Sequence, residues 1–511
     1  MIKVMAKLLF RYIGAMAAVL IVLIILNQWQ PETDETPPYV EVYEQGAVPI
    51  YFTSYEDIDE TISSKIWQKT KERRNLKKFY KINVQKSDLI PLNRYIPDTR
   101  PQELNLPQAS VVITYHNEWP SILLRTIFSV VDRTPKHLIK EIILVDDAST
   151  DPVTYDITKF LRKQTLDVPI VYKTMDSRSG LVRARLEAMK EIKGHVVVFL
   201  DSHMEVNRGW LEPLLLEISK DRRILVMGHL DYINSKTLDY NFIKDYRTRY
   251  GFDWRLHFFE TYFRPSQTID AVSTSTLPGV VAVGSAFAID VSYFREIGMY
   301  DRGMKIWGGD NIELSIRIWS CGGRVLHAAC SKVGHIARNQ PYSFLDDRLN
   351  VELYNYKRIV EVWFDEYKEY VYDIYPQMKK IHPGDLSSQF AIRKQLFCKP
   401  FKWFLHNVWP ELFPYKQNVE EWGMVVGRIQ DSSPDLCLDN NRHLFPTPAR
   451  LLVKPCTGDR VSQMMSLTKD EHLRTVLQCI VVAQENYDFV PLLHSCQDNK
   501  NISTWEYNVS M

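Results

Sequence analysis

A run of apolar residues leading into polar side chains stands out near the middle of the chain. Residues 196–205 read VVVFLDSHME, so that five apolar residues lead directly to Asp201 and His203. Such a run is typical of a buried strand, and side chains two residues apart point to the same face of a strand. Asp201 and His203 can therefore bind one metal ion together with a third ligand from elsewhere, although a strand-end Asp can also simply cap a helix.

Strands and helices alternate from Ala109 up to this run. We expect strands at 110–115, 141–145, 169–173 and 196–200, and helices at 120–132, 152–164 and 181–192. This order predicts a parallel sheet covered by helices, and right-handed crossovers bring the carboxyl ends of its strands to one edge. Because open α/β sheets bind ligands at that edge, Thr114, Asp147 and Asp201 predict a site there.

After Asp201 the alternation gives way to longer, aromatic-rich segments. We expect most of these aromatic residues to pack in the core or in a lid and a minority to line an open groove. Residues 304–315 read MKIWGGDNIELS and place two glycines and Asp310 directly before a helix that we expect to end near Cys321. Glycines in such a turn allow the backbone to approach a ligand closely.

The overall composition excludes nucleic acid as a partner. The chain has 511 residues, of which 45% are hydrophobic and 24% charged, enough for a large core and, we expect, two domains. Its formal net charge of +1 provides no overall attraction for nucleic acid. The sequence also contains neither a zinc-finger spacing nor a basic stripe that could bind nucleic acid locally.

The amino-terminal part predicts a membrane anchor and a stem. Lys3, Lys7 and Arg11 precede an almost wholly apolar run, so we predict a cytoplasmic tail at 1–7 and a transmembrane signal anchor at 8–27. A cleaved signal peptide is the alternative, but no clear small-residue cleavage site follows the run. The proline-containing segment 28–104 predicts a luminal stem. The uncleaved anchor would make the chain a single-pass type II membrane protein.

The cysteines and two sequons indicate an oxidising compartment. All seven cysteines lie within residues 321–496, which fits a protein in which some are paired and one is left over. Asn501 and Asn508 each begin an N-glycosylation sequon. Beyond residue 400, the similar spacing within the pairs 437/456 and 479/496 indicates a small β unit used twice, each closed by one disulfide.

Seven fragments, in this order, resemble the polypeptide N-acetylgalactosaminyltransferases. They are YHNE (115–118), LVDDAS (144–149), RSGLVRAR (178–185), DSH (201–203), GWLEP (209–213), WGG (307–309) and CSKVGH (330–335). The resemblance runs over about residues 105–400 and implies an α/β GT-A, Rossmann-like catalytic domain there. It further implies a linker at 401–422 and a ricin B-type β-trefoil lectin domain at 423–511, incomplete in this chain.

The resemblance also implies an activity and a place in the cell. The family transfers GalNAc from UDP-GalNAc to Ser or Thr of protein or glycopeptide acceptors in the Golgi membrane, with retention at the anomeric carbon. Mn²⁺ held by Asp201, His203 and His335 would neutralise the diphosphate leaving group, and Zn²⁺ is the alternative ion. We assign no general base, because the acceptor hydroxyl attacks on the face of the departing phosphate, which can take its proton.

Further residues receive roles from their positions in the matching motifs. The residues expected at the uridine are Thr114, Asp147 and Arg178. Trp307 would flank the diphosphate, Gly284 would lie near the donor sugar, and Glu118 and Asp310 would orient that sugar. Arg338 and Tyr342 would belong to a loop that closes over the diphosphate. The resemblance pairs Cys321 with Cys398 and leaves Cys330 as the odd thiol.

Several positions depart from the family pattern. Asp310 stands where the family has Glu, Lys305 stands where it has Asp, and the His of the closing loop is missing near Arg338. In the lectin part, Asp439 of the first unit matches a sugar-binding Asp, whereas the second unit lacks it and a third unit is missing. These departures keep a second hypothesis open, a catalytically inactive or weak family member that acts as a Golgi binding protein.

Overall fold

The structure, a computed structural model, describes a large part of the chain beyond residue 81. The described residues are 82–90, 92, 94, 105–150, 156–164, 166–243, 248–268, 271, 276–336, 338, 344, 346–412, 419–427, 435–441, 449–457, 462–475, 478–485, 488–494 and 496. Within this part, no helix has both the length and the apolar character needed to cross a membrane. The predicted anchor at 8–27, the sequons at Asn501 and Asn508, and Tyr342 lie outside the described residues.

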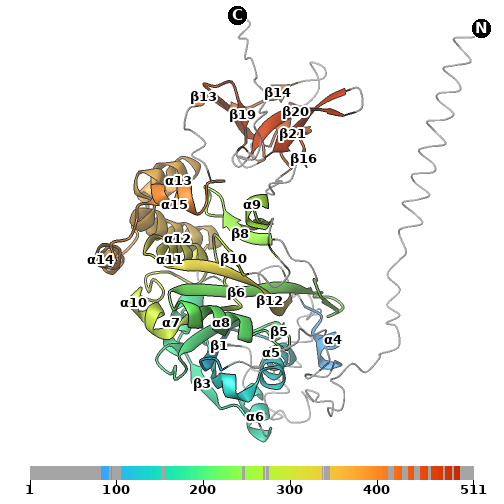
Figure 1. The fold of residues 1–511 in the computed structure, drawn as a ribbon, viewed down its shortest axis with the longest axis vertical. Coiled ribbons are helices and arrows are strands. Elements are labelled where there is room, and N and C mark those ends of the chain that lie inside the picture. Colours follow the sequence, from blue (N-terminus) through green and yellow to red (C-terminus); the bar gives the residue numbers. More distant parts are fainter. Residues whose placement is uncertain are drawn as a thin grey trace, which may run out of the picture. The chain divides into compact units, whose positions relative to one another are not determined.

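A mixed sheet forms the centre of the catalytic part (Figure 1). Its four parallel strands are β1 (Ala109–Tyr115), β2 (Ile139–Asp146), β3 (Ile170–Thr174) and β4 (Val196–Asp201). The sheet continues beyond β4 through β11 (Phe287–Asp290), β6 (Ile224–Ile233), β12 (Arg324–Ile336) and β10 (Thr276–Pro278). Two short strands pair at its side, β5 (Met204–Val206) with β12 and β7 (Tyr240–Asn241) with β6. The predicted parallel sheet is thus present, and the strands added to it include the antiparallel β11 and β10 and the parallel pair β6 and β12.

Alternate residues of the central strands pack into two cores on opposite faces of the sheet. Val111 and Ile113 belong to the core that contains side chains of α5 (Pro120–Arg133), α6 (Asp156–Lys163) and α8 (Glu212–Lys220). Val112 belongs to the other core. Strands covered on both faces read as continuous apolar runs, which is why β1 and β4 could be predicted from the sequence.

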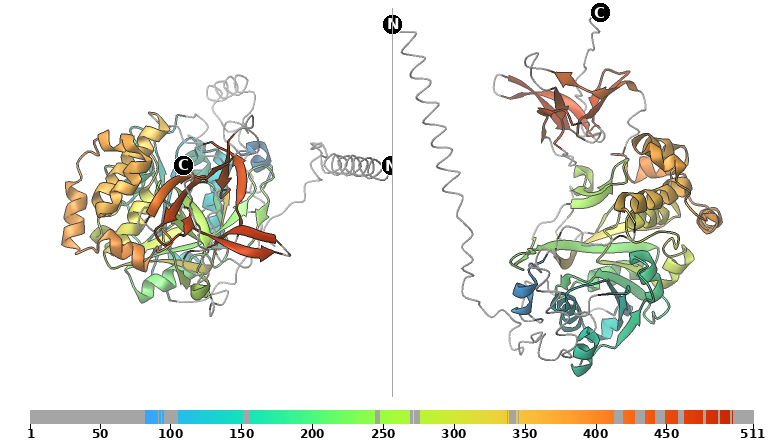
Figure 2. Two further views of the ribbon diagram at one scale, coloured as in Figure 1. Left: turned by 90° about the horizontal axis from the view of Figure 1, so that it is seen from above. Right: turned by 180° about the vertical axis from the view of Figure 1, so that it is seen from behind.

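Most helices of the second core follow the two glycines Gly308 and Gly309 in the sequence. Its helices are α7 (Leu181–Ala188), α10 (Val291–Glu296), α11 (Asp310–Ser320), α12 (Arg348–Trp363), α13 (Lys368–Ile374) and α15 (Phe401–Asn407). The helices from α11 onward gather on one side of β6 and β12 in all three views, together with α14 (Ser387–Gln395) (Figures 1 and 2). A hairpin of β8 (Thr248–Phe252) and β9 (Phe258–Tyr262) contributes Phe252 and Phe259 to this core.

Two domain boundaries differ from those expected. Residues 82–94 were expected in the stem, but helix α4 (Val84–Asp88) and its flanks bury apolar side chains against Trp119 and Ile122, and Arg94 forms an ion pair with the buried Glu205 at 2.7 Å. Residues 401–412 were expected in the linker, yet Phe401 and Phe404 are fully buried in the second core. Both segments are too short for their apolar pattern to reveal a tertiary partner.

The carboxyl-terminal part is all β. Its larger sheet contains β13 (Val419–Met424), β18 (Met464–Thr468), β19 (Leu473–Arg474), β20 (Cys479–Glu485), β21 (Asp488–His494) and β16 (Ala449–Arg450). A smaller sheet contains β14 (Val426–Gly427), β15 (Leu436–Asp439) and β17 (Leu452–Pro455). Disulfides Cys437–Cys456 and Cys479–Cys496 lie in this part, and Cys321–Cys398 lies in the catalytic part, so the three expected pairs are formed. Cys330 lies outside these disulfides.

Candidate active site

Three potential metal ligands meet at the carboxyl edge of the sheet. Asp201 ends β4, His203 follows it, and His335 comes from β12, where it pairs with Met204 of β5. Ligand atoms of all three residues lie within 4.8 Å of one another, and Nε2 of His335 is 3.8 Å from Oδ2 of Asp201. The register of β1 and β4 sets Thr114 opposite Asp201, so the predicted gathering of strand ends is confirmed.

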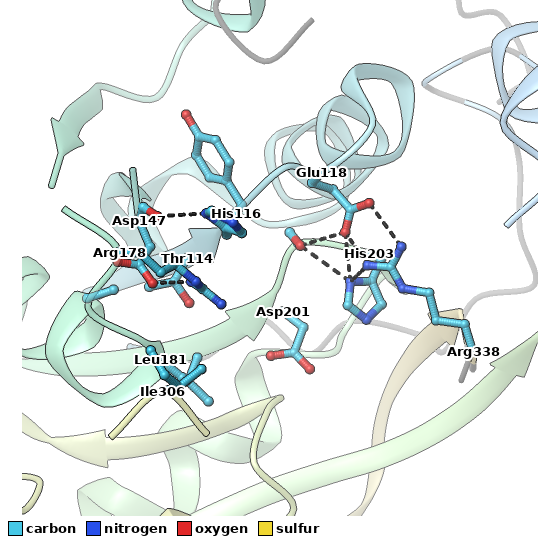
Figure 3. Close-up of a pocket in the computed structure, with 13 residues that line it drawn as sticks. Thr114, His116, Glu118, Asp147, Arg178, Leu181, Asp201, His203, Ile306 and Arg338 are labelled. Atoms are coloured by element: carbon cyan, nitrogen blue, oxygen red, sulfur yellow. Dashed lines mark hydrogen bonds and ion pairs between the residues drawn. The ribbon is translucent and has the colours of Figure 1, made fainter. Parts of the chain in front are cut away.

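Glu118 contacts His203, one of these potential metal ligands (Figure 3). Its buried carboxylate lies 3.1 Å from Nδ1 of His203 and accepts hydrogen bonds from the Ser202 hydroxyl at 2.9 Å and from Arg338. Burial alone would raise the pKa of Glu118, but the Arg338 guanidinium and His203 lower it to about 2. A carboxylate at Nδ1 favours the tautomer that donates from this nitrogen, which leaves Nε2 of His203 with a lone pair for a metal ion.

Asp147 organises the turn that precedes helix α7. Its carboxylate accepts hydrogen bonds from the backbone N–H groups of Ser179 at 2.7 Å and Gly180 at 2.8 Å, and it forms an ion pair with Arg178. Together with Thr114, these side chains line a pocket of about 70 Å³ that reaches Asp201 and Glu118. The structure thus brings together all three residues expected at the uridine.

A larger pocket of about 400 Å³ lies on the other side of Asp201. Four residues that we expected at the diphosphate or the donor sugar line it: Gly284, Trp307, Asp310 and Arg338. Glu118 lines only the smaller pocket, which places it behind His203 and not beside Asp310. Asp201, His203 and Arg338 line both pockets, so the candidate metal site lies between them.

Asp310 is buried at the start of α11, directly after Gly309 in a left-handed conformation with φ 80°. Burial raises the pKa of its carboxyl group, while Arg185 acts in the opposite direction. The site therefore combines two very different acids. Glu118 is surrounded by donors that stabilise its charge, and Asp310 is buried with less compensation.

Arg185 is a site residue that sequence reasoning missed. Its guanidinium donates hydrogen bonds to the Gly284 carbonyl at 2.6 Å and to the Tyr300 hydroxyl at 3.0 Å, and it lies 3.4 Å from Oδ1 of Asp201. Its carbon Cζ also lies 5.2 Å from the centre of the Phe199 ring. The RSGLVRAR fragment contains this residue, but the pattern gave no reason to separate a buried arginine from a solvated one.

Asp439 in the carboxyl-terminal part is engaged in internal bonds. It is buried and accepts hydrogen bonds from the backbone N–H of Asn441 at 2.6 Å, the Ser462 hydroxyl at 3.1 Å and the Gln463 amide at 3.1 Å. Its expected contact with sugar stays a prediction.

Comparisons with known proteins identify the family. Residues 110–298 match glycosyl transferase family 2, and residues 425–511 match the ricin-type beta-trefoil lectin domain. The chain is 40% identical to polypeptide N-acetylgalactosaminyltransferase 13 of Rattus norvegicus over 430 residues, which cover 81% of this chain and 75% of that protein. The chain belongs to the polypeptide N-acetylgalactosaminyltransferase family. It is also 38% identical to polypeptide N-acetylgalactosaminyltransferase 5 of Caenorhabditis elegans over 78% of this chain and 64% of that protein.

A solved structure of a family member supports the same arrangement. The crystal structure of GalNAc-T7 with UDP, GalNAc and Mn²⁺ has a TM-score of 0.63 and 29% identity to this chain, covering 92% of this chain and 85% of that one. The expected GT-A-like catalytic domain followed by an all-β lectin domain is thereby confirmed. One carboxylate and two imidazoles form a donor set that suits a divalent transition-metal ion.

Proposed function

We propose that this N-acetylgalactosaminyltransferase family member transfers GalNAc from UDP-GalNAc to Ser or Thr hydroxyls of protein and glycopeptide acceptors, with retention at the anomeric carbon. The observation that carries the proposal is the convergence of Asp201, His203 and His335 between the two pockets. The family supplies the donor and acceptor classes. Thr114, Asp147 and Arg178 would hold the uridine in the smaller pocket, and Gly284 and Asp310 would face the sugar in the larger one.

Asp201, His203 and His335 would hold Mn²⁺. When bound, such an ion neutralises the negative charge that develops on a diphosphate leaving group. Burial and the neighbouring His203 lower the pKa of His335 to about 3, so its imidazole is neutral near pH 7 and ready to act as a ligand. Glu118 lies 3.1 Å from Nδ1 of His203 and fixes the orientation of this second imidazole.

The chain's side chains act by positioning and by charge. Glu118 is a weak base because Arg338 and His203 hold its pKa at about 2, and Asp201 belongs to the candidate metal set. We therefore assign no general base and infer that the acceptor hydroxyl attacks on the side of the departing phosphate, which takes its proton. Arg338 would stabilise charge at the diphosphate, with Trp307 beside it, and the role expected for Tyr342 stays a prediction.

The proposed setting is the Golgi lumen. The predicted signal anchor at 8–27 would make the chain a single-pass type II membrane protein, with the catalytic part luminal. Three disulfides in the described residues fit an oxidising compartment.

A transfer assay tests the proposed function. Secreted residues 28–511 would be incubated with Mn²⁺, radiolabelled UDP-GalNAc and a panel of Ser/Thr peptides and GalNAc-bearing glycopeptides, beside the variant Asp201→Ala. We expect transfer that the variant abolishes. Folded protein that binds UDP but transfers nothing would overturn the proposal and favour a silent binding protein.

A further inference from the structure

A strained loop forms part of the wall of both pockets. Ile306 lines the smaller pocket, while Trp307, Gly309 and Asp310 line the larger one. Ile306 has a φ of 29° and Gly308 a φ of 113°. A β-branched residue with positive φ is unfavourable and persists only where its surroundings hold it. The loop 305–309 therefore depends on groups outside itself.

Asn355 of helix α12 holds this loop through its backbone. The Asn355 side-chain oxygen accepts a hydrogen bond from the N–H of Lys305 at 2.8 Å. Its amide nitrogen donates to the carbonyl oxygens of Lys305 at 2.9 Å, Trp307 at 3.2 Å and Gly308 at 3.0 Å. Asn355 is fully buried, so water cannot replace these bonds if the side chain is changed.

The opposite side of the loop is fixed by the start of helix α7. The N–H of Leu181 donates to the carbonyl oxygen of Ile306 at 2.9 Å. A Cβ added to Gly180 would lie 2.3 Å from Cα of Ile306, which leaves no room for the loop to move that way. The loop is thus held between α7, whose first turn is organised by Asp147, and α12.

We propose that Asn355 is a positioning residue for the donor sugar, an inference that rests on the proposed transferase function. Asn355 lines neither pocket, so it acts only through the loop that carries Trp307 and leads into Asp310. An amide is required because the loop presents one N–H and three carbonyl oxygens to the same side chain. A carboxylate of the same shape would accept from Lys305 but would meet the three carbonyl oxygens without a proton to donate.

The test compares Asn355→Asp with Val360→Ala. Val360 lies on the same helix, is fully buried and belongs to the second core, so its truncation destabilises α12 without removing a bond to the loop. A milder variant, Asn355→Ser, would be measured in parallel in case Asn355→Asp does not fold. All proteins would be prepared as residues 28–511 and first compared by thermal unfolding.

Two measurements follow. In hydrogen exchange, we expect the amides of residues 303–309 to lose protection in the Asn355 variants, while those of β1 and β2 keep it. In kinetics with UDP-GalNAc, we expect kcat/KM to fall by roughly 100-fold, since displacing a reacting group by about 1 Å has an effect of that size. The Kd of UDP alone, measured by calorimetry, should change much less than kcat/KM, because Ile306 is the one residue of this loop that lines the smaller pocket with Thr114, Asp147 and Arg178.

The two measurements separate two kinds of failure. If the wild-type protein transfers no GalNAc, the proposed function fails, but loop protection in the exchange experiment still decides the role of Asn355. Protection at 303–309 that is equal in Asn355→Asp, Asn355→Ser and Val360→Ala would overturn the inference. So would a loss of kcat/KM in Val360→Ala as large as that in the Asn355 variants, because the effect would then report only on the stability of α12.

Discussion

The two walls of the candidate site are held in different ways. The wall behind His203 is built from charges, since Glu118 accepts hydrogen bonds from Ser202 and Arg338 and its pKa is lowered to about 2. The wall beside the larger pocket relies on burial and on backbone bonds, since burial raises the pKa of Asp310 and Asn355 binds the loop before it. The first wall should therefore respond to loss of charge, and the second to loss of shape.

Removal of the residue shared by both walls should have the largest effect. Asp201 lines both pockets, so Asp201→Ala removes a candidate metal ligand and disturbs both sides. We expect transfer to fall by about 100–1,000-fold, the order found when a charge-stabilising group is removed from an active site. Transfer assays and Mn²⁺ titration would measure this. Asp221→Ala, at a partly exposed carboxylate outside both pockets, is the control, and equal activity of the two variants would contradict the assignment.

The charged wall can be tested by neutralising Glu118. In Glu118→Gln the side chain keeps its shape but loses the charge that orients His203 and pairs with Arg338. We expect the affinity for Mn²⁺ to fall by about 10–100-fold, as is typical when a partner of a metal-binding histidine is changed. Calorimetric titration of Mn²⁺ into the variant would show this, and Glu217→Gln is the control, because Glu217 lies on helix α8 and lines neither pocket. An unchanged affinity would mean that Glu118 does not prepare His203.

The second wall should give the opposite pattern. Asp310→Asn keeps the size of the side chain, and because Asp310 lies outside the candidate metal set, we expect Mn²⁺ affinity to stay as in the wild type. Transfer should fall roughly tenfold, since one hydrogen bond to a charged group contributes on the order of 1.5 kcal/mol. Steady-state kinetics with UDP-GalNAc, beside Mn²⁺ titration, would separate the two effects. A loss of metal affinity equal to that of Glu118→Gln would erase the distinction between the walls.

The sequence predicted the parallel half of the sheet better than its surroundings. Strands β1 and β4 are covered on both faces and therefore leave apolar runs that can be recognised locally. The gathering of Thr114, Asp147 and Asp201 then followed from the handedness of the connections. By contrast, no local pattern shows that 82–94 and 401–412 bury side chains in the catalytic part, because their partners lie far away in the sequence.

The individual site residues show the same limit. The motif that contains Glu118 predicted its presence near the site, but its place behind His203 depends on Arg338, which lies 220 residues further along the chain. Asn355 lies 47 residues beyond the carbonyl of Gly308 that it binds. A buried amide on an amphipathic helix gives no sign of its partner in the sequence, since helix periodicity predicts burial and not the identity of a contact.

The sheet beneath both walls should lose stability in acid through two buried histidines. His229 on β6 and His327 on β12 have ring centres 6.2 Å apart. Burial lowers the pKa of His327 to about 3, with a further contribution from Arg249, and burial together with His327 and Lys332 lowers that of His229 to about 2. In the unfolded chain both would bind protons near pH 6.5, which the folded chain does not, so stability falls as pH drops below that value.

This effect concerns the stability of the fold and does not depend on catalysis. Between pH 7.5 and 5.5 we expect each histidine to lower the free energy of unfolding by about 1.4 kcal/mol. Urea unfolding at several pH values would measure this, and His327→Phe should remove about half of the joint contribution because a phenyl ring does not titrate. His406→Phe, at an exposed position on α15, serves as the control. If His327→Phe and the wild type lose stability equally over this range, the buried pair does not set the acid sensitivity of the sheet.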